Sequence, residues 1–385
     1  MSSLDEPARP RPAGRAPRST RDLLLQAALL AVCLGFAGLV ASTAASNIAQ
    51  RGIPVGFGFL FDPAGFSVAE TLLPYDPANS NLWAVVVGVG NTLFVSGLVA
   101  FGSTCLGAAL AVGRMSGNPL ISGLAPIWIE GVRNVPPILL LIFLYTMWWK
   151  VFPSGDVVQL APGVLGSIRG IAVPTVVGPW YVGPVLLAAL VGALALIGRA
   201  VVAGGAVFKT PAAYGWLALV AGAGLTLAAA HVTLSVPVPN GQDIVGGLSL
   251  TPELFTIVFG LTLYTTGFIA EILRGGLEAV PRGQWEAARA LGLARSDILR
   301  RVVMPQMMQV VIPPMTSQYI NIIKNSTLAL AIGYSEFMTI MGTMINKTNH
   351  AVEGTTVIIV VYLLINLGAA LLLDRYNRRV ARLER

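Results

Sequence analysis

The segment that decides the fold is Glu271–Gln306, EILRGGLEAVPRGQWEAARALGLARSDILRRVVMPQ, the longest strongly polar stretch between two apolar runs. Six of the chain's 25 Lys and Arg residues fall within it. Apolar side chains recur at helical spacing on both sides of Gly292, which predicts two short helices joined at that glycine. Glycine takes positive φ at no steric cost, so Gly292 suits a left-handed helix cap, and Pro305 is expected to close the second helix. The pattern favours a rigid basic elbow that another molecule contacts; an ordinary solvated loop is the competing interpretation.

Composition places this elbow in a membrane protein. The 385 residues are 55% hydrophobic and only 11% charged, with a mean hydropathy of +0.74, whereas soluble domains carry about 25% charged residues. Eight apolar runs approach the roughly 20 residues that a spanning helix needs. They are Leu23–Ala45, Trp83–Gly113, Pro136–Trp149, Tyr181–Ile197, Ala212–Val236, Leu254–Ala270, Val310–Ile332 and Val357–Leu373. We therefore expect an all-α polytopic protein with about eight transmembrane helices.

The positive charges fix the expected orientation. With the N-terminus in the cytoplasm, 20 of the 25 Lys and Arg residues lie on that side and four on the other, while Lys324 lies inside a span. This bias predicts that both termini and the elbow are cytoplasmic. The expected organisation is a disordered basic tail (1–22), an extra N-terminal helix with a periplasmic loop (23–82), a membrane domain (83–374) with inserted helices and loop at about 150–250 and a cytoplasmic loop at 274–306, and a basic tail (375–385).

Several motifs resemble one family. Glu286-Ala287-Ala288, followed by Gly292 and, nine residues later, by Val302-x-Met304-Pro305, is similar to the E-A-A signature of ABC-importer permeases. The blocks that extend this resemblance are Asn91-Thr92-Leu93, Glu130 to Pro136 with its E-x-x-R-x-x-P pattern, Ala270 to Gly276, and Asn321 to Leu328. The extra N-terminal helix and the insertion at 150–250 look like the larger permease subunits of general L-amino-acid importers of Gram-negative bacteria.

The resemblance implies a function and a set of partners. It implies a type I ABC importer permease core in the bacterial inner membrane, moving L-amino acids, polar or acidic ones. The elbow residues expected to dock on a separate ATPase are Trp285, Glu286, Ala287, Ala288, Gly292 and Pro305. A second, different permease chain and a periplasmic amino-acid-binding protein complete the expected complex, and no nucleic acid is expected.

No enzyme motif accompanies this pattern. The sequence contains no G-x-x-x-x-G-K-[ST] loop, so ATP and Mg²⁺ are expected on the partner ATPase, and this chain is expected to bind no cofactor. Two cysteines in apolar runs and two distant histidines give no expected disulfide or metal site.

Ionisable residues inside apolar spans are costly, and each is a candidate functional site. Lys324 stands among Asn321, Asn325 and Ser326 in a run expected to be broken upstream by Pro313 and Pro314. This polar face either lines the substrate path or holds Lys324 as a structural clamp, for example to Glu271. Two structural ion pairs are expected near the inner surface. They are Glu130 with Arg133, three residues apart, and Glu271 with Arg274.

Two other classes of function compete with the importer. An ion-coupled secondary transporter would carry carboxylates near mid-membrane and internal repeats, whereas the carboxylates here are expected at span ends. The third class is a non-transporting assembly subunit of a membrane complex. ATPase-dependent uptake separates the importer from both.

Overall fold

The computed structural model describes residues 20–52, 55–114, 118–152, 156–178, 233–241 and 243–382. The chain divides into two compact units, one ending at Phe57 and the other running from Gly58 to Arg385. The first unit holds α1 (Thr20–Arg51), whose window Leu24–Thr43 has a mean hydropathy of 2.3 and no buried residue within the structure. A helix that is apolar on all sides suits a lipid environment. Most of the predicted tail 1–22 lies outside the described residues.

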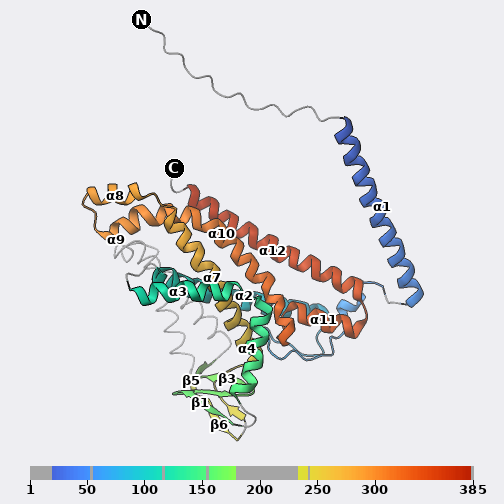
Figure 1. Ribbon diagram of the computed structural model, residues 1–385. Coiled ribbons are helices and arrows are strands. Elements are labelled where there is room, and N and C mark those ends of the chain that lie inside the picture. Colours follow the sequence, from blue (N-terminus) through green and yellow to red (C-terminus); the bar gives the residue numbers. More distant parts are fainter. Residues whose placement is uncertain are drawn as a thin grey trace. The chain divides into compact units, whose positions relative to one another are not determined.

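The second unit is built on helices that the sequence pattern largely anticipates (Figure 1). They are η1 (Gly58–Phe61), α2 (Asn81–Arg114), α3 (Pro119–Arg133), α4 (Pro137–Val151), α7 (Pro252–Glu278), α8 (Arg282–Ala290), α9 (Arg295–Asp297), η3 (Ile298–Val303), α10 (Met304–Asn325), η4 (Ser326–Ile332), α11 (Phe337–Thr348) and α12 (Ala351–Arg382). The predicted tail 375–385 is therefore helical as far as Arg382.

Four of the described helices, α1, α2, α7 and α12, are long and apolar enough to cross a membrane, and six spans result if each bent pair counts as one. The pairs are α3 with α4, bent by 100°, and the stretch Ile298–Ile332 with α11, bent by 51°. The predicted run Tyr181–Ile197 lies outside the described residues. So does most of Ala212–Val236, and the count of eight spans stays a prediction.

The α3–α4 break corrects one expectation. The run Pro136–Trp149 is short for a span unless its helix starts earlier, near Ile127, but α3 ends at Arg133 and a separate helix, α4, starts at Pro137. Two consecutive prolines remove two backbone donors and disfavour helical geometry in the residue before them, so the chain turns there.

The helices α2 and α7 form the centre of the unit. A Cβ on Gly107 of α2 would lie 2.6 Å from Ile269 Cγ2 of α7, and one on Gly88 would lie 2.9 Å from the Phe337 Cα of α11. Small residues therefore let these backbones approach closely. Around them, one buried cluster joins Val99, Leu141, Ile257 and Ile322, which come from α2, α4, α7 and α10.

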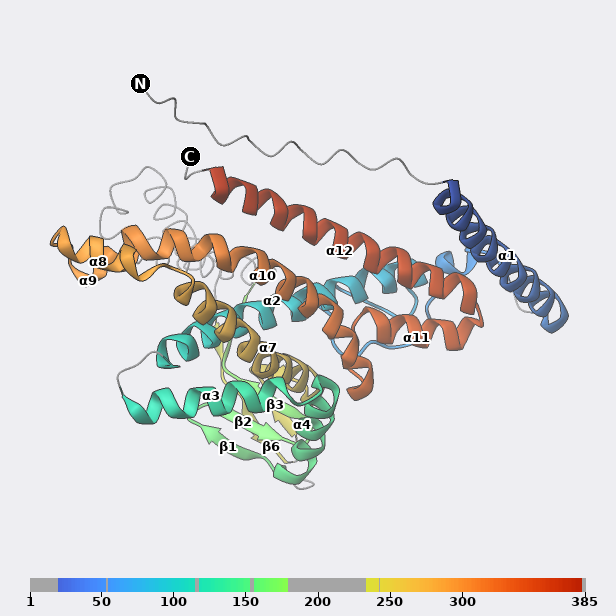
Figure 2. The same cartoon turned by 45° about the horizontal axis from the view of Figure 1, so that its top comes forward.

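Short antiparallel strands occupy the outer segments, and they correct one prediction: the last residues of the run Ala212–Val236, predicted as a transmembrane helix, form the strand β5. One sheet has the order β1 (Val158–Ala161), β2 (Val164–Ser167), β3 (Gly170–Val173) and β8 (Leu248–Leu250). Two further pairs are β4 (Thr175–Val177) with β5 (Thr233–Ser235), and β6 (Val238–Asn240) with β7 (Asp243–Val245). In both views the strands lie beside the end of α7 that is farther from α8 and α9 (Figures 1 and 2).

Candidate functional site

The elbow, defined here as Arg282–Pro305, begins with α8 and ends that helix at a glycine cap. Gly292 has φ +73°, and its N–H donates to the Arg289 carbonyl at 2.9 Å. The Leu293 N–H donates to the Ala288 carbonyl at 3.2 Å. These two bonds form a Schellman motif, which satisfies carbonyls that the helix end leaves free. The predicted helix–glycine–helix geometry is present.

The second half of the elbow differs from the prediction at Pro305. The chain passes from α9 through one π-helical segment, η3, directly into α10, and Pro305 lies in the first turn of α10 rather than closing a helix. A proline lacks the N–H that an α-helix needs, and a π-helical turn before it lets the helix continue in a shifted register. The Gln306 side-chain amide adds a donor there, reaching the Val302 carbonyl at 2.8 Å.

One face of the elbow packs against its own chain. Ala288, Ile298 and Val303 are buried together with Ile269 of α7 and Met307 of α10, and Trp285 packs partly buried against this cluster. Ala288, only 3% exposed, was expected to give close approach to a partner. Its small size instead lets α8 lie close to the spans that follow and precede it, which fixes the elbow as a rigid extension of α7 and α10.

The other face of the elbow is open. Glu286 and Ala287 are exposed, and so is Gly292. Leu291, at the end of α8, has 79% of its surface exposed although it is a large apolar residue. Sequence reasoning did not single out Leu291, which lies at helical spacing with Trp285 and Ala288. Its exposure at the end of α8 makes it a candidate for contact with a partner.

An ion network joins the base of this elbow to α2. Glu271 accepts from Arg114 of α2 at 2.8 Å and from the Arg274 Nη2 at 2.5 Å, and Arg274 also pairs with Glu278. Glu271 therefore contacts Arg274 as expected, and it pairs with Arg114 rather than with Lys324. Because the side chains of Arg114, Glu271 and Arg274 are only about a quarter exposed, these three residues tie the ends of α2 and α7 together.

The second expected pair does not form. No ion pair joins Glu130 to Arg133 in the part of the chain that the structure describes; Glu130 is exposed, and the Arg133 guanidinium lies 5.0 Å from the centre of the Phe268 ring. A cation over an aromatic face is attracted by the ring quadrupole, and Arg133 thereby holds α3 against α7.

Comparison with known proteins assigns the family. The family model described as "Binding-protein-dependent transport system inner membrane component" matches residues 103–382, which include the elbow and the ion network. This chain belongs to that family. It is a membrane transport component and not an enzyme, and the resemblance seen in its motifs is confirmed.

Full-length relatives agree with this assignment. The general L-amino acid transport system permease protein AapQ of Rhizobium johnstonii is 36% identical over 95% of this chain and 93% of the relative. The putative amino-acid ABC transporter permease protein YhdX of Escherichia coli is 36% identical over 95% of this chain and 96% of the relative. The glutamate/glutamine/aspartate/asparagine transport system permease protein BztB of Rhodobacter capsulatus is 30% identical, with 95% of each chain covered.

In this transport component the residues proposed for a substrate path lie at the end of α10. Asn321 and Lys324 are exposed and Asn325 is half-buried, whereas Ser326 is buried and donates to the Ile323 carbonyl at 2.8 Å. Within the described residues Lys324 forms no ion pair.

The predicted break upstream of these residues is absent. Pro313 and Pro314 lie inside the continuous helix α10. Packed neighbours and local adjustments let membrane helices keep such prolines.

Sequence reasoning missed a polar network that joins α2, α11 and α12. Glu336, at the start of α11, is fully buried: its Oε1 accepts from the Thr339 N–H at 2.9 Å, and its Oε2 accepts from the Tyr362 hydroxyl at 3.1 Å and from the Thr92 hydroxyl at 3.3 Å. Glu336 lies four residues beyond the predicted run Val310–Ile332. It caps α11 and joins α2, α11 and α12, and the signal for it was a single acid among apolar residues.

Asn91, from the motif Asn91-Thr92-Leu93, lies next to this network. Its side-chain amide donates to the Ser335 carbonyl at 2.7 Å and to the Glu70 carbonyl at 2.8 Å, and its Oδ1 accepts from the Leu72 N–H at 3.2 Å. Asn91 thus fastens the segment before α2 to both α2 and the start of α11.

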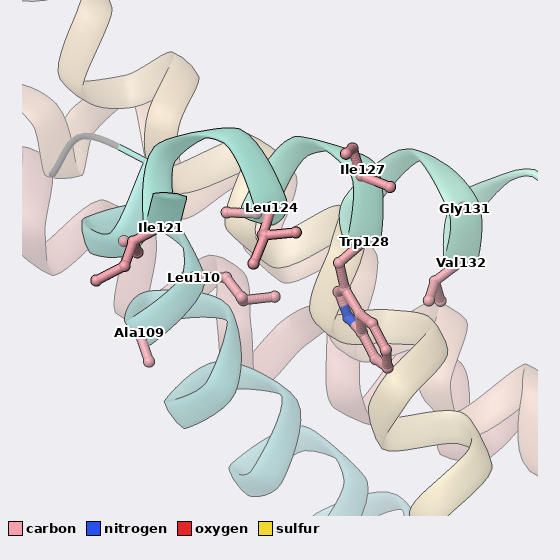
Figure 3. A pocket seen from close by; sticks show the side chains of 10 residues that line it. Ala109, Leu110, Ile121, Leu124, Ile127, Trp128, Gly131 and Val132 are labelled. Atoms are coloured by element: carbon pink, nitrogen blue, oxygen red, sulfur yellow. The ribbon is translucent and has the colours of Figure 1, made fainter. Parts of the chain in front are cut away.

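An apolar cavity of about 790 Å³ lies between the end of α2 and the helix α3, as Figure 3 shows for Leu110, Ile121, Leu124 and Trp128. No charged side chain among the described residues lines it. A zwitterionic amino acid needs polar partners when it leaves water, so this cavity does not have the chemistry of a substrate site.

Proposed function

We propose that this chain is the permease subunit of an ATP-driven, binding-protein-dependent importer that moves L-amino acids, polar or acidic ones, across the bacterial inner membrane. The observation that carries the proposal is the elbow: a rigid helix–glycine–helix unit whose inner face is packed on α7 and α10 and whose outer face exposes Leu291. The amino-acid class follows the names of the three relatives, of which one names glutamate, glutamine, aspartate and asparagine.

The proposed complex contains two ATPase subunits under the elbows, a second permease that is a different chain, and a periplasmic binding protein that delivers the substrate. ATP and Mg²⁺ act on the ATPases. The elbow is cytoplasmic in this proposal, and two observations support that orientation: the bias of Lys and Arg residues toward its side, and the position of the strands at the far end of α7 (Figure 2).

The mechanism is alternating access. Closure of the ATPases displaces α8, and because Ala288 and Ile298 are buried against α7 and α10, these spans move with it. The ion network of Glu271 carries the movement to α2. Each state of the complex must make contacts that the other lacks, since only a difference in interaction free energy shifts the equilibrium.

The test is uptake of radiolabelled L-glutamate into vesicles that hold the complex, with the delivery protein added outside. We expect uptake that requires ATP and survives collapse of the proton gradient. Leu291→Glu is expected to lower uptake by about tenfold or more, because roughly 1.5–3 kcal/mol of apolar contact with the ATPase is lost. Leu291→Met is the matched control and retains uptake.

Two outcomes would contradict the proposal. Uptake without ATP that stops when the proton gradient collapses would identify a secondary transporter. Full uptake by Leu291→Glu at wild-type abundance, with the ATPase still bound, would remove the elbow as the coupling contact. A panel of competing amino acids then defines the substrate class independently of the coupling.

A further inference from the structure

A second cavity, of about 410 Å³, lies at the strand-bearing end of the unit. Its walls come from the segment before α2, from α2 itself, from β8, from the first turn of α7 and from Tyr334.

The polar centre of this cavity is the Glu70 carboxylate. Its Oε1 accepts from the Thr251 N–H at 2.9 Å, which fixes the side chain at the start of α7. Its Oε2 is buried and has no hydrogen-bond partner among the described residues. An unpartnered buried acceptor is costly, and such groups in a native protein call for a ligand or another explanation.

The surroundings of Glu70 are preorganised and negative. The Asn91 side-chain amide donates a hydrogen bond to the backbone carbonyl of Glu70 at 2.8 Å, so the backbone that carries the carboxylate is fixed to α2. Burial is the largest influence on the pKa of Glu70 and raises it; hydrogen bonding from the Thr251 hydroxyl and N–H lowers it in part, and the nearby charge of Glu253 raises it. No ion pair joins Glu70 to a Lys or Arg anywhere in the described ranges.

We propose that this cavity binds one alkylammonium or guanidinium group, with the Glu70 Oε2 as its acceptor. A cationic donor supplies the hydrogen bond that this oxygen lacks and neutralises the local negative charge. The walls beside the carboxylate are apolar, formed by Leu72, Phe94 and Leu254, and they suit the carbon stem of such a group. The group belongs either to a free basic solute or to a Lys or Arg side chain of the docked delivery protein; only the second source rests on the proposed function.

The experiment is equilibrium dialysis of radiolabelled methylguanidinium against the intact complex in nanodiscs. Two variants test the site: Glu70→Gln keeps an oxygen for the Thr251 N–H but removes the charge, and Ser249→Trp fills the cavity without altering the carboxylate. Glu130→Gln is the matched control, because it removes an exposed carboxylate from α3. N-methylurea serves as the uncharged probe of similar shape.

We expect Glu70→Gln to weaken binding by about tenfold or more, because one charge-assisted hydrogen bond is lost. Ser249→Trp is expected to weaken it at least as much by occupying the cavity, while Glu130→Gln matches the wild type. Displacement by L-arginine but not L-citrulline identifies a free solute as the source, and displacement by the substrate-free delivery protein identifies a protein side chain. Equal binding by wild type and Glu70→Gln, or equal displacement by N-methylurea, would overturn the proposal. Equilibrium dialysis requires neither ATP nor uptake, so the binding result can be interpreted even if the proposed transport function is refuted.

Discussion

Substitution of Gly292 by alanine isolates the energetic contribution of the elbow's cap. Gly292 has φ +73°, and a Cβ built there meets no atom within 4 Å. The substitution therefore introduces no clash and acts only through the backbone, where an L-residue in the left-handed region costs about 1–2 kcal/mol. Asparagine tolerates this region better than alanine, so Gly292→Asn is expected to recover part of the loss.

Hydrogen exchange measures this cost at the bonds that it weakens. The Gly292 and Leu293 amides donate to the Arg289 and Ala288 carbonyls, and a loss of about 1–2 kcal/mol predicts exchange roughly 5 to 30 times faster at these two amides. Gly283→Ala is the matched control: Gly283 lies within α8, a Cβ there also meets nothing within 4 Å, and its φ is not in the left-handed region. Alanine in a helix is favourable, so slower exchange in α8 is expected.

The reasoning fails if the two amides exchange at the wild-type rate in Gly292→Ala. It also fails if Gly292→Asn raises their exchange rate as much as Gly292→Ala does. Either result would mean that the φ of this residue does not limit the elbow. Faster exchange in both Gly292→Ala and Gly283→Ala would instead point to a general sensitivity of α8 to added side chains.

Three further perturbations test the packing and the buried acids. Gly107→Val is expected to lower the melting temperature of the protein, because its Cβ would lie 2.6 Å from Ile269, whereas Gly97→Val, with nothing within 4 Å, leaves it unchanged. Glu336→Ala leaves buried donors without an acceptor and is expected to cost about 1–3 kcal/mol for each, measured as a loss of thermal stability. The pKa of Glu70 is raised in the folded chain, so its contribution to stability is full below the ordinary pKa of 4.5 and is lost as pH rises through the folded value. Glu70→Gln is expected to remove that slope from melting curves recorded across this range.

The sequence anticipated those features that rest on local chemistry. Helical spacing and one glycine were enough to predict α8 and its cap at Gly292, because a left-handed cap depends on the residue at that one position. Long apolar runs likewise predicted α2, α7 and α12, since a spanning helix satisfies all its backbone groups within itself.

Features that depend on contacts between distant segments were not predictable. Pro305 was expected to end a helix, but the π-helical turn before it carries the helix on. Glu130 and Arg133 have the spacing of an ion pair, yet Phe268, far away in the sequence, competes for the cation. Ala288 was assigned to a partner's surface because no local signal tells an alanine packed on its own chain from one left open. The strands β1–β8 are three or four residues long, too short for a clear alternating pattern.

The helix α7 connects the Glu70 cavity at its start to the elbow at its end. This single helix of 27 residues, about 40 Å long, begins where the Thr251 N–H meets Glu70 and ends one turn before α8. A helix in lipid keeps every backbone hydrogen bond, so it resists bending and moves as a rigid body. The chain does have a break at Pro136, where α3 and α4 meet at 100°, and both of these helices pack on α7. A displacement of α8 is therefore expected to reach the Glu70 carboxylate through α7 while the α3–α4 corner accommodates it, so we expect binding at Glu70 and the position of the elbow to be coupled.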